Sequence, residues 1–331
     1  MTHGGGGERI LSDVANFLVA RGHTVEVHSL PLRRQSVPSG LDAKVMYCEK
    51  WAHKFQADVA YYIYTPLTDR LFYSRSPKIA GLHGAVVGDY SSTGSLDFMK
   101  QGPLVAGAFV IRRVLGDALL REFDAVHTVD PSGLPISHRK VFVIPNWVSC
   151  SRAQPQLKRK RPEKFRVLFV GKPSYNKGFD IFTEASRLFD QEDIEFVATF
   201  EHSNSGRVKC LGYVPQGQLW KLYATSGVLL HPTRNETFGL AILESLASGT
   251  PVITTPIRCH TSLGLPVHYA SDLMAIVQKL KQQYILWKED YQSYLAQTEE
   301  YQDAILRYDQ SVMLLKFEAM LYETANHISR T

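Results

Sequence analysis

The stretch TRNETFGLAILESLASGTPVITT, from Thr233 to Thr255, decides the fold. It follows the apolar run GVLLH, passes through a polar loop, and becomes an amphipathic segment that begins near Gly239. Gly249 stands where a glycine commonly ends a helix, and PVITT then resumes an apolar, β-branched run. This order predicts a strand, a loop, a helix and a second strand, which is the repeating unit of a parallel α/β sheet.

The loop-to-helix junction in this stretch predicts a binding site. The amides of Phe238, Gly239 and Leu240 would lie at the new helix end, where unpaired N–H groups and the helix dipole favour an anion. Glu236 and Glu244 stand before and inside the helix. Carboxylates repel phosphate but accept hydrogen bonds from paired hydroxyls, so these two favour sugar or ribose recognition. Taken by themselves, they are more typical of an acidic first turn and one solvated glutamate.

A second strand-to-helix loop lies upstream, in RVLFVGKPSYNKGFDIFTEA at residues 166–185. Its strand ends at Gly171, and Lys172 and Lys177 stand in the loop before Gly178 opens the next helix. Two lysines beside such a loop suit a diphosphate, although either lysine alone is more typical of an ordinary surface. Because ligands of open parallel sheets bind at the carboxyl ends of strands, we expect both loops to contribute to one site.

With these residues in this order and spacing, the second half resembles a large family of retaining glycosyltransferases with the two-domain GT-B fold. This is the glycosyl transferases group 1 family, also called family four, whose members contain G-R-x(4)-K-G and E-x(7)-E. The matching residues are Gly171, Lys172, Lys177, Gly178, Glu236, Phe238, Gly239, Leu240 and Glu244, followed by GTPV at 249–252.

The resemblance implies a role for each matching residue. Lys172 and Lys177 would bind the donor diphosphate and stabilise its charge as it leaves. Glu236 would hold hydroxyls of the donor sugar, Glu244 would hold the nucleotide ribose, and the amides of residues 238–240 would cradle phosphate. Lys172 stands where the family usually has arginine, so the charge is kept while the bidentate fork is lost.

The resemblance also covers the first half. His83, in LHGAVVGDY, matches a histidine that would contact the donor sugar or the acceptor, and a histidine without such a role is the alternative. Trp147 stands where the family usually has glycine, and its ring would narrow or fill the cleft. The family's glycine loop, which faces donor and acceptor, is matched by Gly4, Gly5, Gly6 and Gly7. Only three residues precede this loop, so we expect the first sheet to lack its central strand.

Composition narrows the class of protein. The 331 residues are 44% hydrophobic and 21% charged, which suits two folded domains. A net charge of +5 fits an anionic ligand or a membrane surface and is too small to indicate nucleic-acid binding. Four widely separated cysteines predict reduced thiols, with neither a zinc site nor a disulfide framework. Together with a start that has no apolar leader, they predict a cytoplasmic protein.

Apolar runs alternate with amphipathic stretches throughout, which predicts an α/β protein with two Rossmann-like domains. We place an acceptor domain at residues 1–150, a basic linker at 151–164 and a donor domain at 165–331. A helix at 308–325 is expected to pack back on the first domain. Strands are expected at 24–29, 59–64, 78–82, 125–129, 141–145, 166–170, 195–200, 227–231 and 251–255. Helices are expected at 8–21, 104–123, 179–189, 216–225, 239–248 and 271–282, and throughout 285–324.

The resemblance implies transfer of a sugar from a nucleotide-diphosphate sugar, with retention of configuration and without metal or cofactor. The acceptor would be a glycan, a lipid or a small molecule. The basic run 158–161 and the stretch 104–120 could rest on anionic lipid and make the protein peripheral at the membrane. A solvated linker and a core-facing helix are the preferred alternative. Two rival functions stay open, namely a GT-B nucleotide-sugar epimerase and a degenerate, non-catalytic protein that binds nucleotide sugars.

Overall fold

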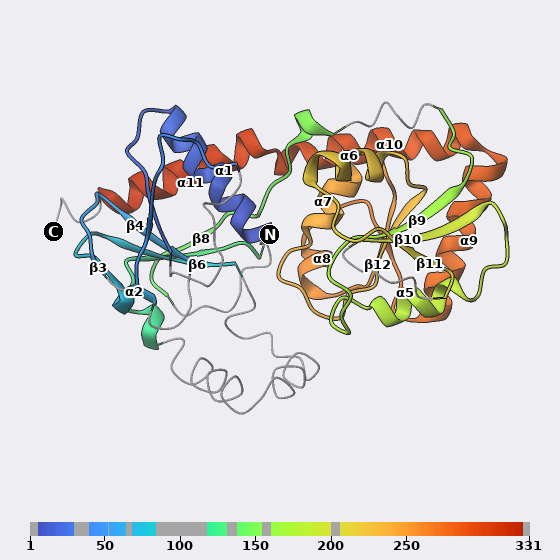
Figure 1. Cartoon of the computed structure of the whole chain (residues 1–331), viewed down its shortest axis with the longest axis horizontal. Coiled ribbons are helices and arrows are strands. Elements are labelled where there is room, and N and C mark those ends of the chain that lie inside the picture. The colour runs from blue at the N-terminus through green and yellow to red at the C-terminus, as the bar shows by residue number, and fades with distance from the viewer. Residues whose placement is uncertain are drawn as a thin grey trace. The chain divides into compact units, whose positions relative to one another are not determined.

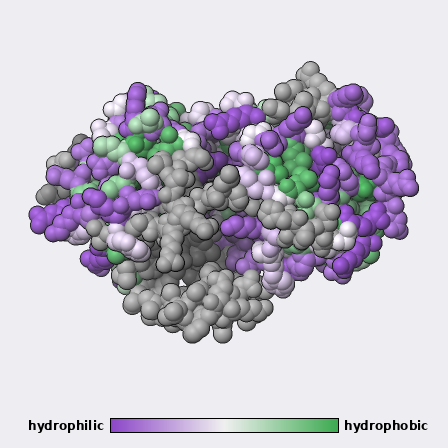
Figure 2. Space-filling model, in the orientation of Figure 1, coloured by the Kyte–Doolittle hydropathy of each residue, from purple (hydrophilic) through white to green (hydrophobic). Residues whose placement is uncertain are grey.

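The computed structural model describes residues 6–29, 40–51, 53–63, 68–83, 118–130, 138–153, 160–199 and 206–326. The chain forms two compact α/β units (Figure 1). Unit 1 comprises residues 1–146 together with 311–331, and unit 2 comprises residues 147–310. Within the described ranges, every helix is too short or too polar to cross a lipid bilayer. On the face shown in Figure 2, hydrophilic residues predominate and hydrophobic residues appear in smaller groups.

Unit 2 is built on one six-stranded sheet in which every strand pair is parallel. The order β11-β10-β9-β12-β13-β14 places β10 and β11 on one side of β9 and the later strands on the other. The chain therefore reverses its direction of travel across the sheet between β9 and β12. The strands are β9 (Phe165–Phe169), β10 (Ile194–Ala198), β11 (Val208–Cys210), β12 (Val228–His231), β13 (Val252–Thr254) and β14 (His268–Tyr269).

Helices flank this sheet on both sides, with α6 and α7 on the opposite side of the strands from α9 in Figure 1. Asp272 starts α9 with an N-cap, because its carboxylate accepts a hydrogen bond from the amide of Ala275 at 2.9 Å. The helices of unit 2 are α5 (Phe179–Ser186), α6 (Gln216–Ala224), α7 (Leu240–Ala247), α8 (Arg258–Ser262), α9 (Leu273–Glu289) and α10 (Tyr291–Ile305), with short 3-10 turns at Cys150–Arg152 and Leu306–Tyr308.

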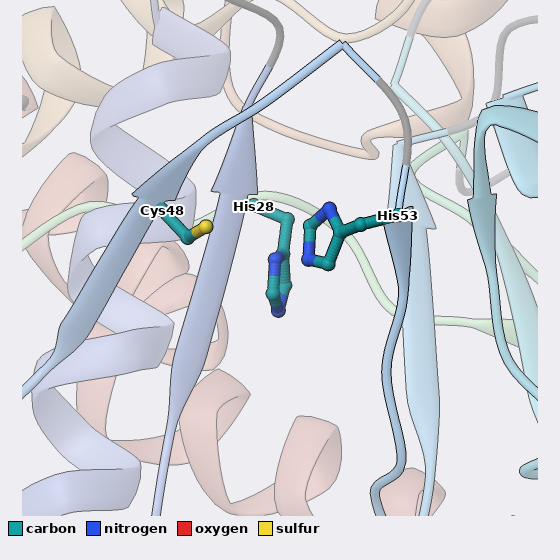
Figure 3. Close-up of side chains that lie close together, drawn as sticks. All are labelled: His28, Cys48 and His53. Carbon is teal, nitrogen blue, oxygen red and sulfur yellow. The ribbon is translucent and has the colours of Figure 1, made fainter.

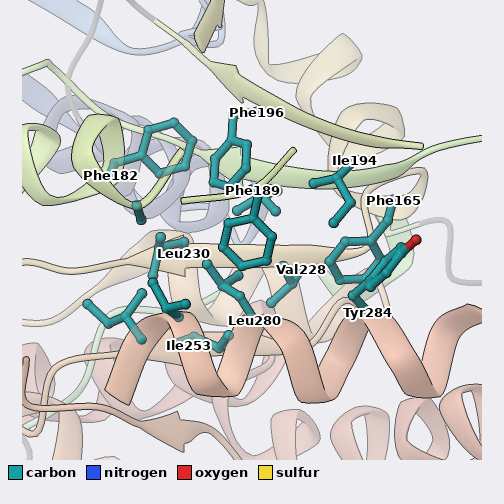
Figure 4. Packing of buried hydrophobic residues seen from close by; sticks show 14 of the residues in the cluster. Phe165, Phe182, Phe189, Ile194, Phe196, Val228, Leu230, Ile253, Leu280 and Tyr284 are labelled. Atoms are coloured by element: carbon teal, nitrogen blue, oxygen red, sulfur yellow. The ribbon is translucent and has the colours of Figure 1, made fainter. Parts of the chain in front are cut away.

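The core of unit 2 is rich in aromatic side chains (Figure 4). Alternate residues of β9, namely Phe165, Val167 and Phe169, enter one cluster, while Leu168 between them is buried elsewhere. Both faces of the strand are thus covered, as expected for a parallel sheet between helices. Helix α9 contributes residues such as Leu280 and Tyr284, four positions apart and therefore on one face of the helix.

Unit 1 is also α/β, with α1 (Gly6–Ala20), α2 (Thr68–Leu71) and α11 (Gln310–Ala325) around parallel strands. One sheet has the order β4-β6-β7-β8, and β1 pairs only with β2 within the described residues. The described strands of unit 1 therefore fall into separate sheets. The strands are β1 (Glu26–Ser29), β2 (Met46–Glu49), β3 (His53–Lys54), β4 (Ala60–Ile63), β5 (Phe72–Tyr73), β6 (Lys78–Leu82), β7 (Ala125–Thr128) and β8 (Val141–Val143).

Helix α11 follows unit 2 along the chain, but all of it after Gln310 belongs to unit 1. Its carboxylate Glu318 is only 6% exposed and lies 2.7 Å from the Nε of Arg21 and 3.0 Å from the Nε2 of His23. Phe317, on the same helix, packs its ring against Tyr61 of β4 and His127 of β7. An ion-pair cluster and an aromatic contact therefore attach the C-terminal helix to the first unit.

The expected strands and helices are present wherever the structure describes them. The stretch 285–324 is helical, as expected, with a break between α9, which ends at Glu289, and α10, which starts at Tyr291. Asp290 causes this break, since its carboxylate accepts from the amide of Ser293 and caps the new helix. Most of the helix expected at 104–123, and the basic pair at 158–159, lie outside the described residues.

Candidate functional site

The candidate site lies at the carboxyl ends of β9 and β12, where the strand order of unit 2 reverses. Side-chain and backbone groups converge there because parallel strands end at the same edge. The loop after β9 contains Gly171, Lys172 and Lys177, and the loop after β12 contains Glu236. The two loops are joined by backbone, since the amide of Arg234 donates to the carbonyl oxygen of Asn176 at 2.8 Å. Both expected loops therefore meet.

Glu236 is the centre of this site. The Nζ of Lys177 lies 2.5 Å from Oε1 of Glu236, and the Nε2 of His231 lies 2.5 Å from Oε2. The Nε2 of His260, a buried residue of α8, lies 3.6 Å from the same Oε2. One carboxylate is thus surrounded by an ammonium group and two imidazoles that come from three separate segments.

The electrostatics of this group favour an ionised carboxylate. Burial acts to raise the pKa of Glu236, but the charge of Lys177 and the contacts that the imidazoles of His231 and His260 make with the carboxylate outweigh burial and lower that pKa well below its ordinary value. Burial lowers the pKa of His231, so its imidazole stays neutral near pH 7 and donates its Nε2 proton to the carboxylate. The ion pair at neutral pH is therefore Lys177 with Glu236.

The helix start predicted near Gly239 is present, and its role in binding an anion stays a prediction. Gly239 precedes the helix in the left-handed region, with φ of 96°, and Leu240 is its first residue. A Cβ on Gly239 would lie 3.1 Å from Ile242 and 3.2 Å from the Nε2 of His260, so glycine keeps this approach open. Phe238 is 2% exposed and anchors the loop in the core. The amides of the first turn are thus presented beside Glu236.

The loop at residues 171–178, called the lysine loop, is positioned by Gly178. This residue has φ of 69° and packs against Pro232, whose carbonyl oxygen would be 2.0 Å from an added Cβ. Gly171, with φ of 144°, ends the strand in a conformation that side chains rarely adopt. Lys172 is exposed, whereas the Lys177 side chain is 29% exposed and held by Glu236. The structure therefore distinguishes the two predicted phosphate-binding lysines.

Glu244 is buried inside α7, at 4% exposure. Its Oε1 accepts from the amide of Gln216 and its Oε2 from the hydroxyl of Tyr223, both at 3.0 Å. The two partners belong to α6, so the carboxylate joins these helices. Its role toward a ribose stays a prediction, with Gln216 as a neighbour that could share the same hydroxyls.

His83 lies in unit 1, directly after β6, and joins a chain of buried polar rings. Its Nε2 is 2.7 Å from the hydroxyl of Tyr61, which is 2.6 Å from the Nδ1 of His127. The Nε2 of His127 donates to the carbonyl oxygen of Ile144 at 2.8 Å, so its Nδ1 accepts the tyrosine proton. Gly81 leaves room for this arrangement, because a Cβ there would lie 2.0 Å from the Tyr61 hydroxyl oxygen.

Acid should destabilise unit 1 through these histidines. Burial lowers the pKa of His83 to about 4 and that of His127 to about 3, and the charge of His83 also lowers the latter. Below pH ~6.5 these histidines bind protons in the unfolded chain but stay neutral in the folded protein. The free energy of unfolding therefore falls as pH decreases toward 4. Each ring should contribute on the order of 2–3 kcal/mol of this loss.

Chemical unfolding from pH 7 to pH 4 tests this expectation, with His83→Gln as the variant. Glutamine keeps a polar side chain but does not titrate, so the variant should lose stability less steeply over this range than the original chain. An unchanged pH slope in His83→Gln would contradict the assignment.

Two residues of the site were missed by sequence reasoning. His231 is the last residue of β12, and a polar side chain at the end of a buried strand beside Glu236 is a signal that could have found it. His260 has no such signal, because α8 returns to the site only through tertiary folding. Of the predicted glycine loop, Gly6 and Gly7 begin α1, and Gly4 and Gly5 lie outside the described residues.

Two groups in the described part of the chain bring potential metal-ligating atoms within 4.8 Å of one another. One is the site itself, through His231, Glu236 and His260. There the ammonium of Lys177 already compensates the charge of Glu236. The other group lies in unit 1 and consists of His28, Cys48 and His53.

Comparison with solved structures identifies the fold. The structure is similar to a glycosyltransferase from Rickettsia africae, with a TM-score of 0.73, 15% identity, and 98% of this chain and 96% of that one covered. It is also similar to Anabaena HepE, solved in complex with UDP and glucose, with a TM-score of 0.68, 14% identity and 97% of each chain covered. At such identities the likeness shows the fold, which is the GT-B fold of glycosyltransferases.

Sequence comparison adds the family. Residues 151–262 match the model of glycosyl transferases group 1, so this segment is similar to that family. Over 169 residues, 46% of this chain, it is 27% identical to a phosphatidylinositol N-acetylglucosaminyltransferase subunit of Arabidopsis thaliana. Over 144 residues, 36% of this chain, it is 27% identical to the D-inositol 3-phosphate glycosyltransferase of Paenarthrobacter aurescens. The matched segments span only 36% and 35% of these relatives.

Proposed function

We propose that the chain transfers a sugar from a nucleotide-diphosphate sugar to a hydroxyl acceptor, with retention of configuration and without metal ion or cofactor. The observation that supports this most directly is the Lys177–Glu236 ion pair at the strand-order reversal of unit 2, inside the segment that matches the family. Such a pair offers a cation for the diphosphate and a carboxylate for sugar hydroxyls at adjacent positions.

The geometry suggests how the pair works. When a donor binds, its diphosphate attracts the ammonium of Lys177, and its sugar hydroxyls donate to the carboxylate of Glu236. His231 stays bonded to Glu236 and keeps it oriented. The amides at the start of α7 and the exposed Lys172 add further positive potential for the diphosphate. Because these groups are in place before reaction, they stabilise the leaving charge without reorganisation.

In the proposed reaction, the bond between the anomeric carbon and the diphosphate oxygen breaks while the acceptor oxygen bonds to the same face of that carbon. The acceptor proton passes to the departing diphosphate, so charge and atoms balance. No protein nucleophile is assigned. The acceptor is proposed to be a glycan, a lipid or a small molecule, and the last two are supported by one relative named for phosphatidylinositol and one named for D-inositol 3-phosphate. A cytoplasmic location with peripheral membrane contact is part of the same proposal, supported by the net charge of +5.

Donor binding is expected to raise the melting temperature of the chain. UDP, GDP, ADP, dTDP and their common sugar conjugates would be screened. A ligand at ~100 times its dissociation constant should stabilise the folded state by about 2.7 kcal/mol. Glu244→Gln should remove most of this shift, because it weakens hydroxyl binding without changing side-chain size. Glu184→Gln, at an exposed position of α5, is the matched control and should keep the shift.

The outcomes of this screen separate the candidate functions. A shift with one nucleotide, lost in Glu244→Gln and kept in Glu184→Gln, supports the donor site and names the base. Turnover of the sugar conjugate without acceptor into an epimer would favour an epimerase, and binding without any turnover would favour a non-catalytic protein. A cooperative melt that no nucleotide shifts would contradict the proposed donor site.

A further inference from the structure

A second cluster of ligand-type side chains lies in unit 1, away from every residue assigned to the donor site. His28 is on β1, Cys48 is on β2 and His53 is on β3. Figure 3 shows the Cys48 sulfur directed toward His28, and the rings of His28 and His53 beside each other between the strands. One nitrogen of each ring and the Sγ of Cys48 lie within 4.8 Å of one another.

The backbone explains why these three side chains meet. His28 and Cys48 are directly paired across the parallel β1–β2 ladder, so their side chains leave the sheet on the same face. The ring of His53 then approaches that of His28 from β3, with 4.4 Å between ring centroids. Phe55 stacks on His28 at 4.9 Å, and Phe72 meets the edge of His53 at 5.8 Å. Both imidazoles are therefore held in fixed orientations.

The hydrogen bonding of the rings leaves lone pairs uncompensated. The Nε2 of His28 is 3.0 Å from the carboxylate of Glu26, which makes Nε2 the protonated nitrogen and Nδ1 the acceptor. That Nδ1, and the Nδ1 of His53, are buried atoms without a hydrogen-bond partner among the described residues. A buried polar atom left unpaired costs about 1–3 kcal/mol. Aromatic packing alone does not explain why two buried ring nitrogens near the Cys48 thiol are left without a hydrogen-bond partner.

We propose that His28, Cys48 and His53 bind a zinc ion. Two imidazoles and a thiolate are ligands that Zn²⁺ prefers, and three protein ligands leave a fourth position for water or another group. On binding, the Cys48 thiol releases its proton as the sulfur bonds to the metal. All three residues are partly exposed.

Glu26 is a positioning residue in this arrangement. Histidines that bind metals commonly donate their other ring proton to a carboxylate, which orients the ring and strengthens the ligand, and Glu26 stands in that place behind His28. The site thus combines ligand type, spacing and a supporting carboxylate.

Metal titration of the full chain tests the proposal. After removal of metal by chelation, Zn²⁺ would be titrated in competition with a chromophoric chelator, and Co²⁺ would be added as a spectroscopic probe. One Zn²⁺ per chain and a sulfur-to-cobalt charge-transfer band are expected. Cys48→Ser should abolish the band, and Cys210→Ser, a partly exposed thiol in unit 2, should retain it. Glu26→Gln should weaken Zn²⁺ binding by about 10–100-fold.

Further variants distinguish metal binding at this cluster from metal binding at the other candidate group. Glu236→Gln disrupts the His231–Glu236–His260 group and should leave the charge-transfer band unchanged. His53→Asn provides an independent ligand deletion if Cys48→Ser fails to fold, as judged by circular dichroism, and it should also abolish the band. No stoichiometric Zn²⁺, a cobalt spectrum without thiolate character, or a band that survives in folded Cys48→Ser or His53→Asn would overturn the proposal. None of these results depends on the proposed transferase activity.

Discussion

Replacing Lys177 with methionine is expected to lower donor turnover by about two to three orders of magnitude. The variant removes the ammonium that lies 2.5 Å from Glu236 and, in the proposed reaction, meets the charge of the leaving diphosphate. Loss of one preorganised charge directed at the leaving group has an effect of this size, because the charge is in place before the reaction. Turnover would be measured as nucleotide released from the donor that produces the largest melting shift.

Two controls make this result specific. Lys209→Met changes the same charge at an exposed position of β11 and should leave turnover within about twofold, because exposed charges are screened by solvent. A cooperative melt of Lys177→Met would show that Glu236, still bonded to His231, tolerates the loss. Turnover within tenfold of the original chain in a folded Lys177→Met variant would remove Lys177 from the proposed mechanism.

The second large effect is expected on stability, from Gly178→Ala. At φ of 69° a side chain is already strained, and the new Cβ would lie 2.0 Å from the carbonyl oxygen of Pro232. The backbone carbonyl of Pro232 cannot move aside as a flexible side chain can. The lysine loop and the loop before Glu236 must therefore separate. We expect a loss on the order of 3–5 kcal/mol in the free energy of unfolding, together with weaker donor binding.

Gly206→Ala is the matched control for this variant. Gly206 has φ of 58°, close to that of Gly178, but an added Cβ meets nothing within 4 Å. Its substitution should therefore cost only the backbone strain, about 1–2 kcal/mol. Urea unfolding of both variants separates strain from collision. Equal losses in the two variants would show that the contact with Pro232 is not what requires glycine at position 178.

Most of the fold could be predicted because its strands and helices follow from the pattern of neighbouring residues along the chain. The strand predicted at 78–82 has the same first and last residues as β6, and the strand predicted at 166–170 is shifted by one residue from β9. The strands that were missed, such as β2, β11 and β14, are short, and each contains exposed or partly exposed positions. They extend sheets that longer strands begin, so their pairing depends on neighbours rather than on their own pattern.

The meeting of Lys177 and Glu236, 59 residues apart, was also within reach of sequence reasoning. Both stand after buried strands of one parallel sheet, and such strands end at the same edge. The side chains that surround Glu236 and Glu244 could not be predicted from the sequence in this way. His260 reaches Glu236 from α8, and Gln216 and Tyr223 reach Glu244 from α6, and no spacing in the sequence relates these residues.

The sequence by itself determined the parallel α/β architecture, the two loops of the candidate site and the residues on them, because strand patterns and strand-end loops are local. Only the tertiary structure decided which groups surround those residues, including the buried histidines beside Glu236. It also decided the cluster of His28, Cys48 and His53, whose members come from three strands with no metal-ligand spacing along the chain. The physical reason is that side-chain contacts depend on strand register and helix packing, which follow from long-range burial rather than from neighbouring residues.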